Sequence, residues 1–172
     1  MTWAIDKTHS QVSFSVKHMM ISTVHGRFTS FDAQVELDPS ALSAAKVRAD
    51  VDVNSIDTSE PQRDAHLKSA DFFDAERFPK LSFESTRVEA QGSKLSVTGN
   101  LTIRDKTAEV TLTGEIEGPA KDPWGKERIG FSLSGQLERE AFGLGWNQVL
   151  EAGGVLVGKK VTLSIEAQIV KQ

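Results

Sequence analysis

The polar side chains whose types and spacing suit chemistry lie together in one short stretch, where Arg63, Asp64 and His66 follow one another closely. Arginine forms paired hydrogen bonds to phosphate or carboxylate groups. The start of a helix also offers free backbone N–H groups to an anion. Contact with the polar head of a ligand is one interpretation of this set. An Arg–Asp surface pair on a solvated helix face is the other, and these residues alone favour it.

Other combinations of reactive residues are less suited to a reaction. The four histidines are scattered without the close pairs typical of zinc sites, and the chain contains no cysteine. Asp6, His9 and Ser10 lie close in sequence, but no Gly-x-Ser-x-Gly turn accompanies them. We therefore expect no metal, no cofactor and no catalytic residue, and we expect these three side chains to tie down the N-terminal segment.

A single helix is expected to begin at Ser59, inside a chain that otherwise has the pattern of strands. Ser59 and Gln62 have the spacing of a capping box, and Pro61 suits a first helical turn. Phe72 and Phe73 follow shortly after. A short helix with polar side chains beside two large rings is typical of a rim or lid, so we expect function near it.

Alternation of apolar and polar residues predicts the rest of the fold. The alternating segments are residues 12–16, 28–37, 47–53, 81–83, 95–103, 110–116, 129–137 and 161–169. They predict one all-β domain, residues 1–172, with an eight-stranded antiparallel barrel and one short helical segment between strands. A barrel removes the exposed edges of such a sheet, and a sandwich is the alternative.

Small residues on the inward face bear on whether the barrel is hollow. Ala49, Gly99, Gly114, Gly135 and Ala167 occupy central inward positions, where a solid core prefers larger side chains. They favour an apolar cavity that suits a lipid. On this hypothesis, Gly114→Leu or Gly135→Leu fills the cavity and lowers lipid uptake while the protein still folds. The alternative is that the glycines relieve crowding at bends.

Composition limits the possible partners. The chain has 172 residues and a net charge of −4, which argues against nonspecific nucleic-acid binding. We expect no stable membrane insertion, because no apolar run approaches a membrane span. The N-terminus lacks the pattern of a signal peptide, so a cytoplasmic location is expected, or a periplasmic one if a leader was removed.

Three apolar segments lie outside the alternating strands. The stretches 142–147 and 153–158 are apolar for loops, and they predict a plug, a dimer surface or a cavity mouth. Met19, Met20 and Ile21 form a flexible apolar patch that suits an irregular guest, although core packing explains them equally well.

The run Arg63-Asp64-Ala65-His66-Leu67-Lys68-Ser69-Ala70-Asp71-Phe72-Phe73-Asp74 is the densest part of a match to a known family. With this run the chain resembles the YceI-like family, the lipocalin-like polyisoprenoid-binding proteins. Further matching segments are residues 3–10, 12–19, 26–28, 55–58, 78–79, 82–85, 99–104, 124–125, 128–131 and 142–147. The charged pair Asp105-Lys106 departs from the pattern, since the family usually has glycine at that turn.

The resemblance implies a lipocalin-like barrel with a long apolar tunnel that carries an isoprenoid or fatty-acyl lipid, often in a homodimer. By position, the residues expected at the tunnel and its mouth are Phe14, Val16, Met20, Phe28, Phe72, Phe73, Phe83, Leu101, Ile103, Phe131, Phe142 and Trp146. His18, Arg63 and His66 are the candidates for the polar head of the lipid.

The leading hypothesis is a noncatalytic protein that binds, transports or stores one long-chain amphipathic lipid, such as a polyisoprenoid, an isoprenoid quinone or a fatty-acyl molecule. Two alternatives from other classes remain. One is an enzyme that modifies a lipid or quinone head group with His18, Arg63 and His66. The other is a structural or protein-interaction module with a solid core.

Overall fold

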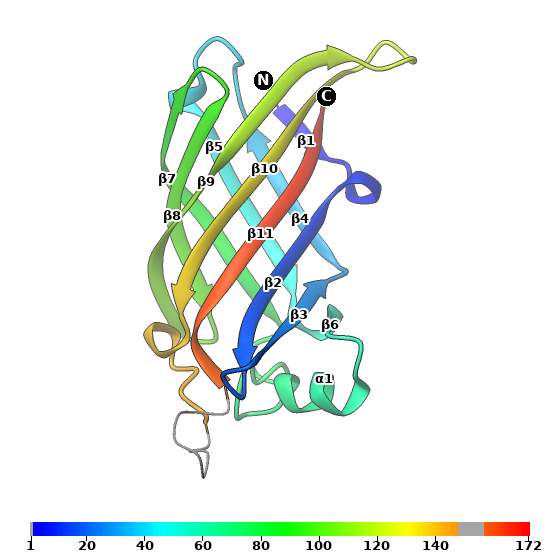
Figure 1. The fold of residues 1–172 in the computed structure, drawn as a ribbon. Helices are drawn as coiled ribbons and strands as arrows, with labels where there is room; N and C mark the ends of the chain where they lie inside the picture. The colour runs from blue at the N-terminus through cyan, green and yellow to red at the C-terminus, as the bar shows by residue number, and fades with distance from the viewer. Residues whose placement is uncertain (1, 148–156) are drawn as a thin grey trace.

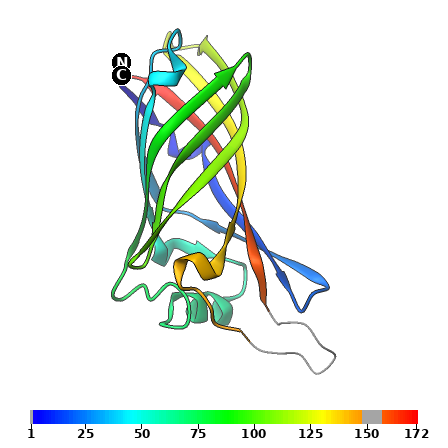
Figure 2. The same cartoon turned by 90° about the vertical axis from the view of Figure 1, so that its left-hand side faces the viewer.

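The computed structural model describes residues 2–147 and 157–172, which form one antiparallel sheet closed on itself (Figures 1 and 2). Its strands are β1 (Thr2–Ile5), β2 (Gln11–His18), β3 (Ser22–Phe28), β4 (Phe31–Glu36), β5 (Lys46–Asp52), β6 (Ile56–Asp57), β7 (Lys80–Gln91), β8 (Lys94–Ile103), β9 (Lys106–Lys121), β10 (Glu127–Glu138) and β11 (Val157–Lys171). The helices between them are α1 (Pro61–Lys68) and the 3-10 helices η1 (Lys7–His9), η2 (Leu42–Ala44), η3 (Val53–Ser55) and η4 (Arg139–Phe142). Most of the apolar stretch 153–158 lies outside the described residues.

The predicted eight-stranded barrel is confirmed, although the described sheet contains eleven strands. β1 pairs with both β4 and β11, which closes the ring β1-β4-β5-β7-β8-β9-β10-β11. The other three strands continue strands of this ring along the chain. After short breaks, β2 follows β1, β3 precedes β4 and β6 follows β5, and these three strands pair in the order β2-β3-β6. Two of the breaks have a local cause. The carboxylates of Asp6 and Asp52 accept hydrogen bonds from backbone N–H groups two residues on, which turns the chain out of the ladder.

The two ends of the barrel differ in their covers (Figure 1). Both chain termini lie at one end, called here the terminal end, where β1 lies between β4 and β11. α1 and η4 lie at the opposite end, called here the helix end. There the hydrogen-bonded sheet order stops at β6, and residues 58–79 leave the barrel and return at β7. The segment that carries α1 therefore lies at the end of the barrel where the described strand order stops at β6.

Apolar side chains gather inside the barrel in two groups, one at each end. Around the buried Trp3, whose indole N–H donates to the Leu37 carbonyl at 3.0 Å, the terminal end has a closely packed cluster. At the helix end a second cluster surrounds Phe28 and Phe142. The period-2 alternation predicted from the sequence thus places apolar groups inside, as a half-buried antiparallel sheet requires.

The N-cap of the helix lies one residue later than predicted, and α1 itself begins at Pro61. Glu60, rather than Ser59, is its N-cap, and its carboxylate accepts hydrogen bonds from the backbone N–H groups of Gln62 and Arg63. Ser59 has a φ of 65°, which belongs to the turn before the helix. The capping-box prediction was wrong because the glutamate next to Pro61 satisfies the same free N–H groups and adds a charge at the helix start.

Candidate functional site

A cavity of about 270 Å³ occupies the barrel interior. Its wall reaches Leu42 and Ala45 beside η2 at the terminal end, and Leu67 of α1 at the helix end, so it runs along the barrel. Well-packed interiors hold few voids larger than a water molecule. The interior is therefore hollow, which contradicts the alternative of a module with a solid core.

Most of the residues predicted to line the tunnel lie on the cavity wall. They are Phe14, Val16, Phe28, Phe72, Phe73, Phe83, Leu101, Ile103 and Phe131. Phe28 lies between two other rings, 5.6 Å from Phe14 and 6.1 Å from Phe73 between ring centroids. Such tilted and edge-on contacts are favourable for aromatic rings, and they form an apolar floor near the helix end.

Three predicted tunnel residues lie elsewhere. Met20 is 59% exposed at the β2–β3 turn, because that hairpin continues past the cavity. Phe142 is 1% exposed and packs in the cluster at the helix end without reaching the cavity wall. Trp146 packs outside the wall, with ring centroids 4.7 Å from His66 and 5.3 Å from Phe72.

The small inward residues divide into two kinds. Ala49 and Ala167 line the cavity, as predicted. A Cβ on Gly114 would collide with the Ser132 carbonyl oxygen, and one on Gly135 would lie 2.5 Å from the Thr111 carbonyl oxygen. These glycines allow β9 and β10 to approach closely and do not create the space. The prediction that Gly114→Leu or Gly135→Leu fills the cavity in a folded protein was therefore wrong.

Arg63 holds α1 to the barrel. Its Nε donates to the Thr58 hydroxyl at 2.8 Å, and its Nη2 donates to the Thr58 carbonyl at 2.6 Å. Asp64 accepts from the same hydroxyl and from the Thr58 backbone N–H. The expected Arg–Asp pair is thus bridged by a buried threonine, and both charged groups anchor the helix start.

His66 and His18 also lie at the helix end, outside the cavity wall. His66 Nε2 is 2.9 Å from an Asp71 carboxylate oxygen, and its ring packs between Phe72 and Trp146. His18 ends β2, opposite Val157 of β11. The structure therefore brings all three predicted head-group residues to one end of the barrel, but none of them lines the cavity.

Sequence reasoning missed Arg139, the basic residue that does line the cavity at the helix end. It is 4% exposed, and its Nε and Nη1 donate to the carbonyls of Gly158 and Leu144 at 2.8 and 2.7 Å. Burial lowers the pKa of this guanidinium. A signal was present, because residue 139 continues the inward register of odd positions 129–137.

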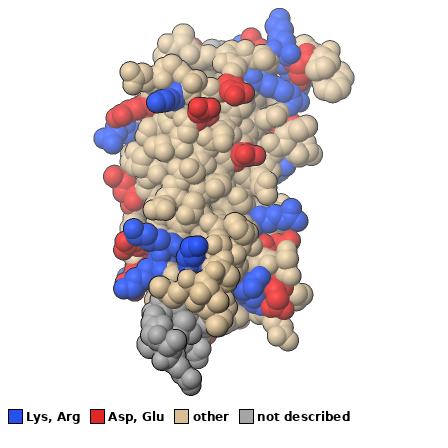
Figure 3. Space-filling model, in the orientation of Figure 1, with Lys and Arg blue, Asp and Glu red and all other residues tan. Residues whose placement is uncertain are grey.

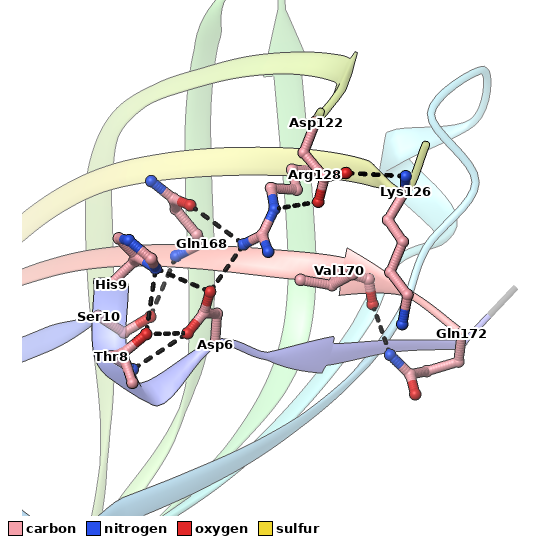
Figure 4. A network of polar contacts seen from close by, with 10 residues as sticks. All are labelled: Asp6, Thr8, His9, Ser10, Asp122, Lys126, Arg128, Gln168, Val170 and Gln172. Atoms are coloured by element: carbon pink, nitrogen blue, oxygen red, sulfur yellow. Dashed lines mark hydrogen bonds and ion pairs between the residues drawn. The ribbon is translucent and has the colours of Figure 1, made fainter. Parts of the chain in front are cut away.

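The predicted N-terminal tie is confirmed as a polar network at the terminal end (Figure 4). Asp6 accepts from Arg128 Nη1 at 2.7 Å and lies 2.8 Å from His9 Nδ1, while the Ser10 hydroxyl accepts from the Gln168 backbone N–H. Hydrogen bonds from Arg128, then from Thr8 and His9, hold the pKa of Asp6 far below its ordinary value of 3.8.

This network lacks the relay of a hydrolase, since the hydrogen bonds described for Ser10 and His9 do not join the two side chains. Within residues 2–147 and 157–172, no three His, Cys, Asp or Glu side chains gather as metal ligands do. In the same part of the chain, no helix is long and apolar enough to cross a membrane.

The chain is similar to several known proteins over nearly its whole length. A UPF0312 protein of Staphylococcus epidermidis is 39% identical over 164 residues, which cover 95% of this chain and 94% of that protein. The crystal structure of Burkholderia cenocepacia BcnA matches with a TM-score of 0.83 and 27% identity, covering 95% of this chain and 98% of BcnA. A polyisoprenoid binding domain from Saccharophagus degradans shares the fold at 12% identity, with a TM-score of 0.72 and coverage of 99% and 98%.

Family membership follows from the extent of these matches. Residues 3–169 match the YceI-like domain, from the buried Trp3 of the first strand to Ile169 of the last. Because this match spans all the strands that close the barrel, the protein belongs to the YceI-like domain family.

Proposed function

We propose that this protein binds one long-chain amphipathic lipid inside the barrel, and that it transports or stores that lipid. The observation that carries the proposal is the cavity of about 270 Å³, whose wall is built almost entirely from apolar side chains. Each methylene moved from water to such a surface contributes roughly 0.8 kcal/mol. Affinity therefore grows with chain length and depends little on the chemical identity of the tail.

An isoprenoid or fatty-acyl chain is the class of ligand that fits. Branched methyl groups or plain methylenes both suit a wall of Phe, Val, Leu and Ile side chains. The Saccharophagus degradans domain, which has the same fold, is described as polyisoprenoid-binding, so an isoprenoid is the first ligand to test.

The head of the lipid belongs at the helix end in this proposal. Arg139 lies on the cavity wall there, and Arg63, His66 and His18 lie around the same end. The cluster around Trp3 leaves the terminal end without a comparable basic group on the wall described for the cavity. In this orientation the polar head lies near Arg139, and the apolar tail extends along the cavity toward Leu42 at the terminal end.

The experiment is extraction of the purified protein into organic solvent followed by mass spectrometry, together with titration of a fluorescent fatty acid. A stoichiometric lipid, or saturable uptake of one probe per chain, is expected. Failure of both measurements would remove the proposal.

A pair of substitutions tests whether the ligand binds inside the barrel. Ala167→Leu adds three carbons to the cavity wall, so we expect weaker uptake of long tails. Ala90→Leu makes the same change at an exposed position of β7 and should leave uptake unchanged. Equal uptake by both variants would show that the lipid lies outside the barrel. Over-packing costs about 1–3 kcal/mol, so the unfolding midpoint of each variant is measured first.

A further inference from the structure

Met19, Met20 and Ile21 form an exposed apolar tip at the helix end. Their exposed fractions are 45%, 59% and 84%, and the other large apolar side chain exposed in the described part of the chain is Trp124. The three residues join β2 to β3, and this hairpin projects from the barrel wall at the helix end (Figure 2). β2 also carries Val16 on the cavity wall, so the tip follows within a few residues of the cavity wall along the chain.

The backbone of this tip is unfavourable for the residues it carries. Met19 and Met20 have φ of 54° and 63°, and the Ile21 N–H donates to the His18 carbonyl at 3.3 Å. Tight hairpin turns with positive φ at both central residues strongly prefer Asn and Gly. The turn geometry therefore gives no reason for two methionines at these positions. Exposure to water is also unfavourable for three neighbouring large apolar side chains, so these residues suit a surface that contacts something apolar.

Basic side chains flank the tip, although they are far apart in sequence. Lys17 precedes the tip on β2. It lies next to Gly158 of β11, because a Cβ added to this glycine would be only 3.1 Å from the Lys17 Cβ. Lys159 and Lys160 follow on β11, and all three lysines are exposed. None of the three forms an ion pair within 4.0 Å among residues 2–147 and 157–172, although Lys160 lies opposite Glu138 in the strand register. Figure 3 shows Lys and Arg side chains, with Asp and Glu side chains among them, on both sides of this end of the molecule.

We propose that Met19, Met20 and Ile21 insert into the interface of a lipid bilayer that carries anionic phospholipids, with Lys17, Lys159 and Lys160 against the phosphate groups. Apolar side chains beside basic ones are the pattern of peripheral membrane binding. This contact turns the helix end of the barrel toward the bilayer, where a lipid passes between membrane and cavity. That purpose rests on the proposed function, but the membrane contact itself is measured independently.

A bilayer fits this tip better than a second copy of the chain does. A stable dimer buries about 800 Å² on each partner, which far exceeds the surface of three side chains at one turn. A bilayer needs no shape complementarity, and flexible methionine side chains adapt to its irregular interior. The flanking lysines also favour an anionic surface over an identical basic one.

The test is sedimentation of the purified chain with vesicles, one set of neutral phosphatidylcholine and one set with a third of phosphatidylglycerol. The double variant Met20→Asp with Ile21→Asp is expected to bind anionic vesicles at least about tenfold more weakly than the unaltered chain. The single variant Ile21→Asp is measured beside it, and Trp124→Asp is the matched control for that single variant. Both add one negative charge at an exposed apolar position, but Trp124 lies on the β9–β10 turn at the terminal end. The control should bind normally.

The lysines give a second, graded measurement. Replacement of Lys159 by Gln should lower binding to anionic vesicles about fivefold, and a second replacement at Lys160 should lower it about as much again. Added salt should have the same effect, because it screens the lysines. Neutral vesicles should show little difference among these variants.

Several results would overturn the proposal. These are equal vesicle binding by the tip variant and the Trp124→Asp control, no vesicle binding by the unaltered chain, or a tip-dependent dimer in analytical ultracentrifugation without vesicle binding. Uptake of the fluorescent fatty acid from solution is measured on the same variants. Normal uptake without vesicle binding rejects the membrane contact alone, whereas vesicle binding without uptake rejects the proposed function alone.

Discussion

The two ends of this barrel are closed by different interactions. At the terminal end, backbone ladders from β1 to β4 and β11 complete the ring, and Arg128 joins Asp6 to Asp122 outside it. At the helix end the described strand order stops at β6, which pairs with β3, and residues 58–79 and η4 lie at this end. Strand ladders resist local opening more than packed loops do. If the proposed function holds, the helix end is therefore the end that we expect to open for a ligand.

The cover at the helix end is held by side chains that reach across loops. Arg139 donates to four backbone carbonyls, those of Leu144, Trp146, Val157 and Gly158. His66, Phe72 and Trp146 form a ring cluster between α1 and the segment after η4. Interactions of this kind break one at a time, whereas a ladder opens only when neighbouring strands separate.

Arg139→Ala should have the largest effect on this contrast. It leaves buried carbonyls without donors, so we expect a loss of roughly 2–4 kcal/mol in the free energy of unfolding, measured by urea titration. Amide exchange should rise first around η4 and the start of β11. Arg87→Ala removes an exposed arginine that pairs with Glu89, and should change stability by less than about 0.5 kcal/mol. Equal losses in both variants would contradict the assigned role of Arg139.

Asp6→Asn should loosen the terminal end by a smaller amount. The Asp6 carboxylate, 14% exposed, accepts from Arg128 and from the Thr8 N–H, so its neutral replacement should cost roughly 1–2 kcal/mol. Exchange should increase in β1 and the start of β10 and stay unchanged around α1. Glu84→Gln, which removes an exposed pair with Arg48, is the control and should have little effect. Increased exchange at α1 would show that the two ends are not independent.

Acid should weaken the terminal end in the same way. The pKa of Asp6 is lowered chiefly by Arg128, and the pKa of Asp122 is lowered by Arg128 and by the Lys126 N–H. A carboxylate with a lowered pKa binds fewer protons in the folded state than in the unfolded state. Its stabilisation is complete above the unfolded pKa of about 4 and is lost as pH falls toward the folded value.

The measurement of this effect is the urea midpoint as a function of pH. It should decline between about pH 5 and pH 2 in the unaltered chain and decline less steeply in Asp6→Asn. Parallel curves for the two proteins would show that Asp6 does not contribute to acid sensitivity.

Trp146→Ala should have the smallest effect on stability and a visible effect on ligand release. It removes ring contacts with His66 and Phe72 that contribute roughly 0.5–1.5 kcal/mol. We expect a fluorescent fatty acid to dissociate several-fold faster in stopped-flow displacement. Trp124→Ala, at the exposed turn of the terminal end, should leave the rate unchanged. An unchanged dissociation rate in Trp146→Ala would contradict ligand release through the helix end.

Much of the wall of this barrel was predictable because alternation is a local property. Phe14, Val16, Leu101 and Ile103 lie on the cavity wall, where their register placed them. The glycines were misjudged because sequence spacing places Gly114 on the inward face but does not show how closely β10 approaches it. Met20 was misplaced for a similar reason, since the point where the β2–β3 hairpin leaves the barrel depends on the neighbouring strands.

The sequence by itself determined that the chain forms strands with apolar side chains on one face, because a period of two residues sorts them to one face of a sheet. The pairing of β1 with both β4 and β11 then closes that sheet into a barrel. Only the tertiary structure decided what that barrel does at its ends. It joined Arg139 to carbonyls from two segments, and it brought Lys17 of β2 beside Gly158 of β11. These are contacts between strands distant in sequence, and they are fixed by strand order and by how far each hairpin extends, which no local pattern encodes.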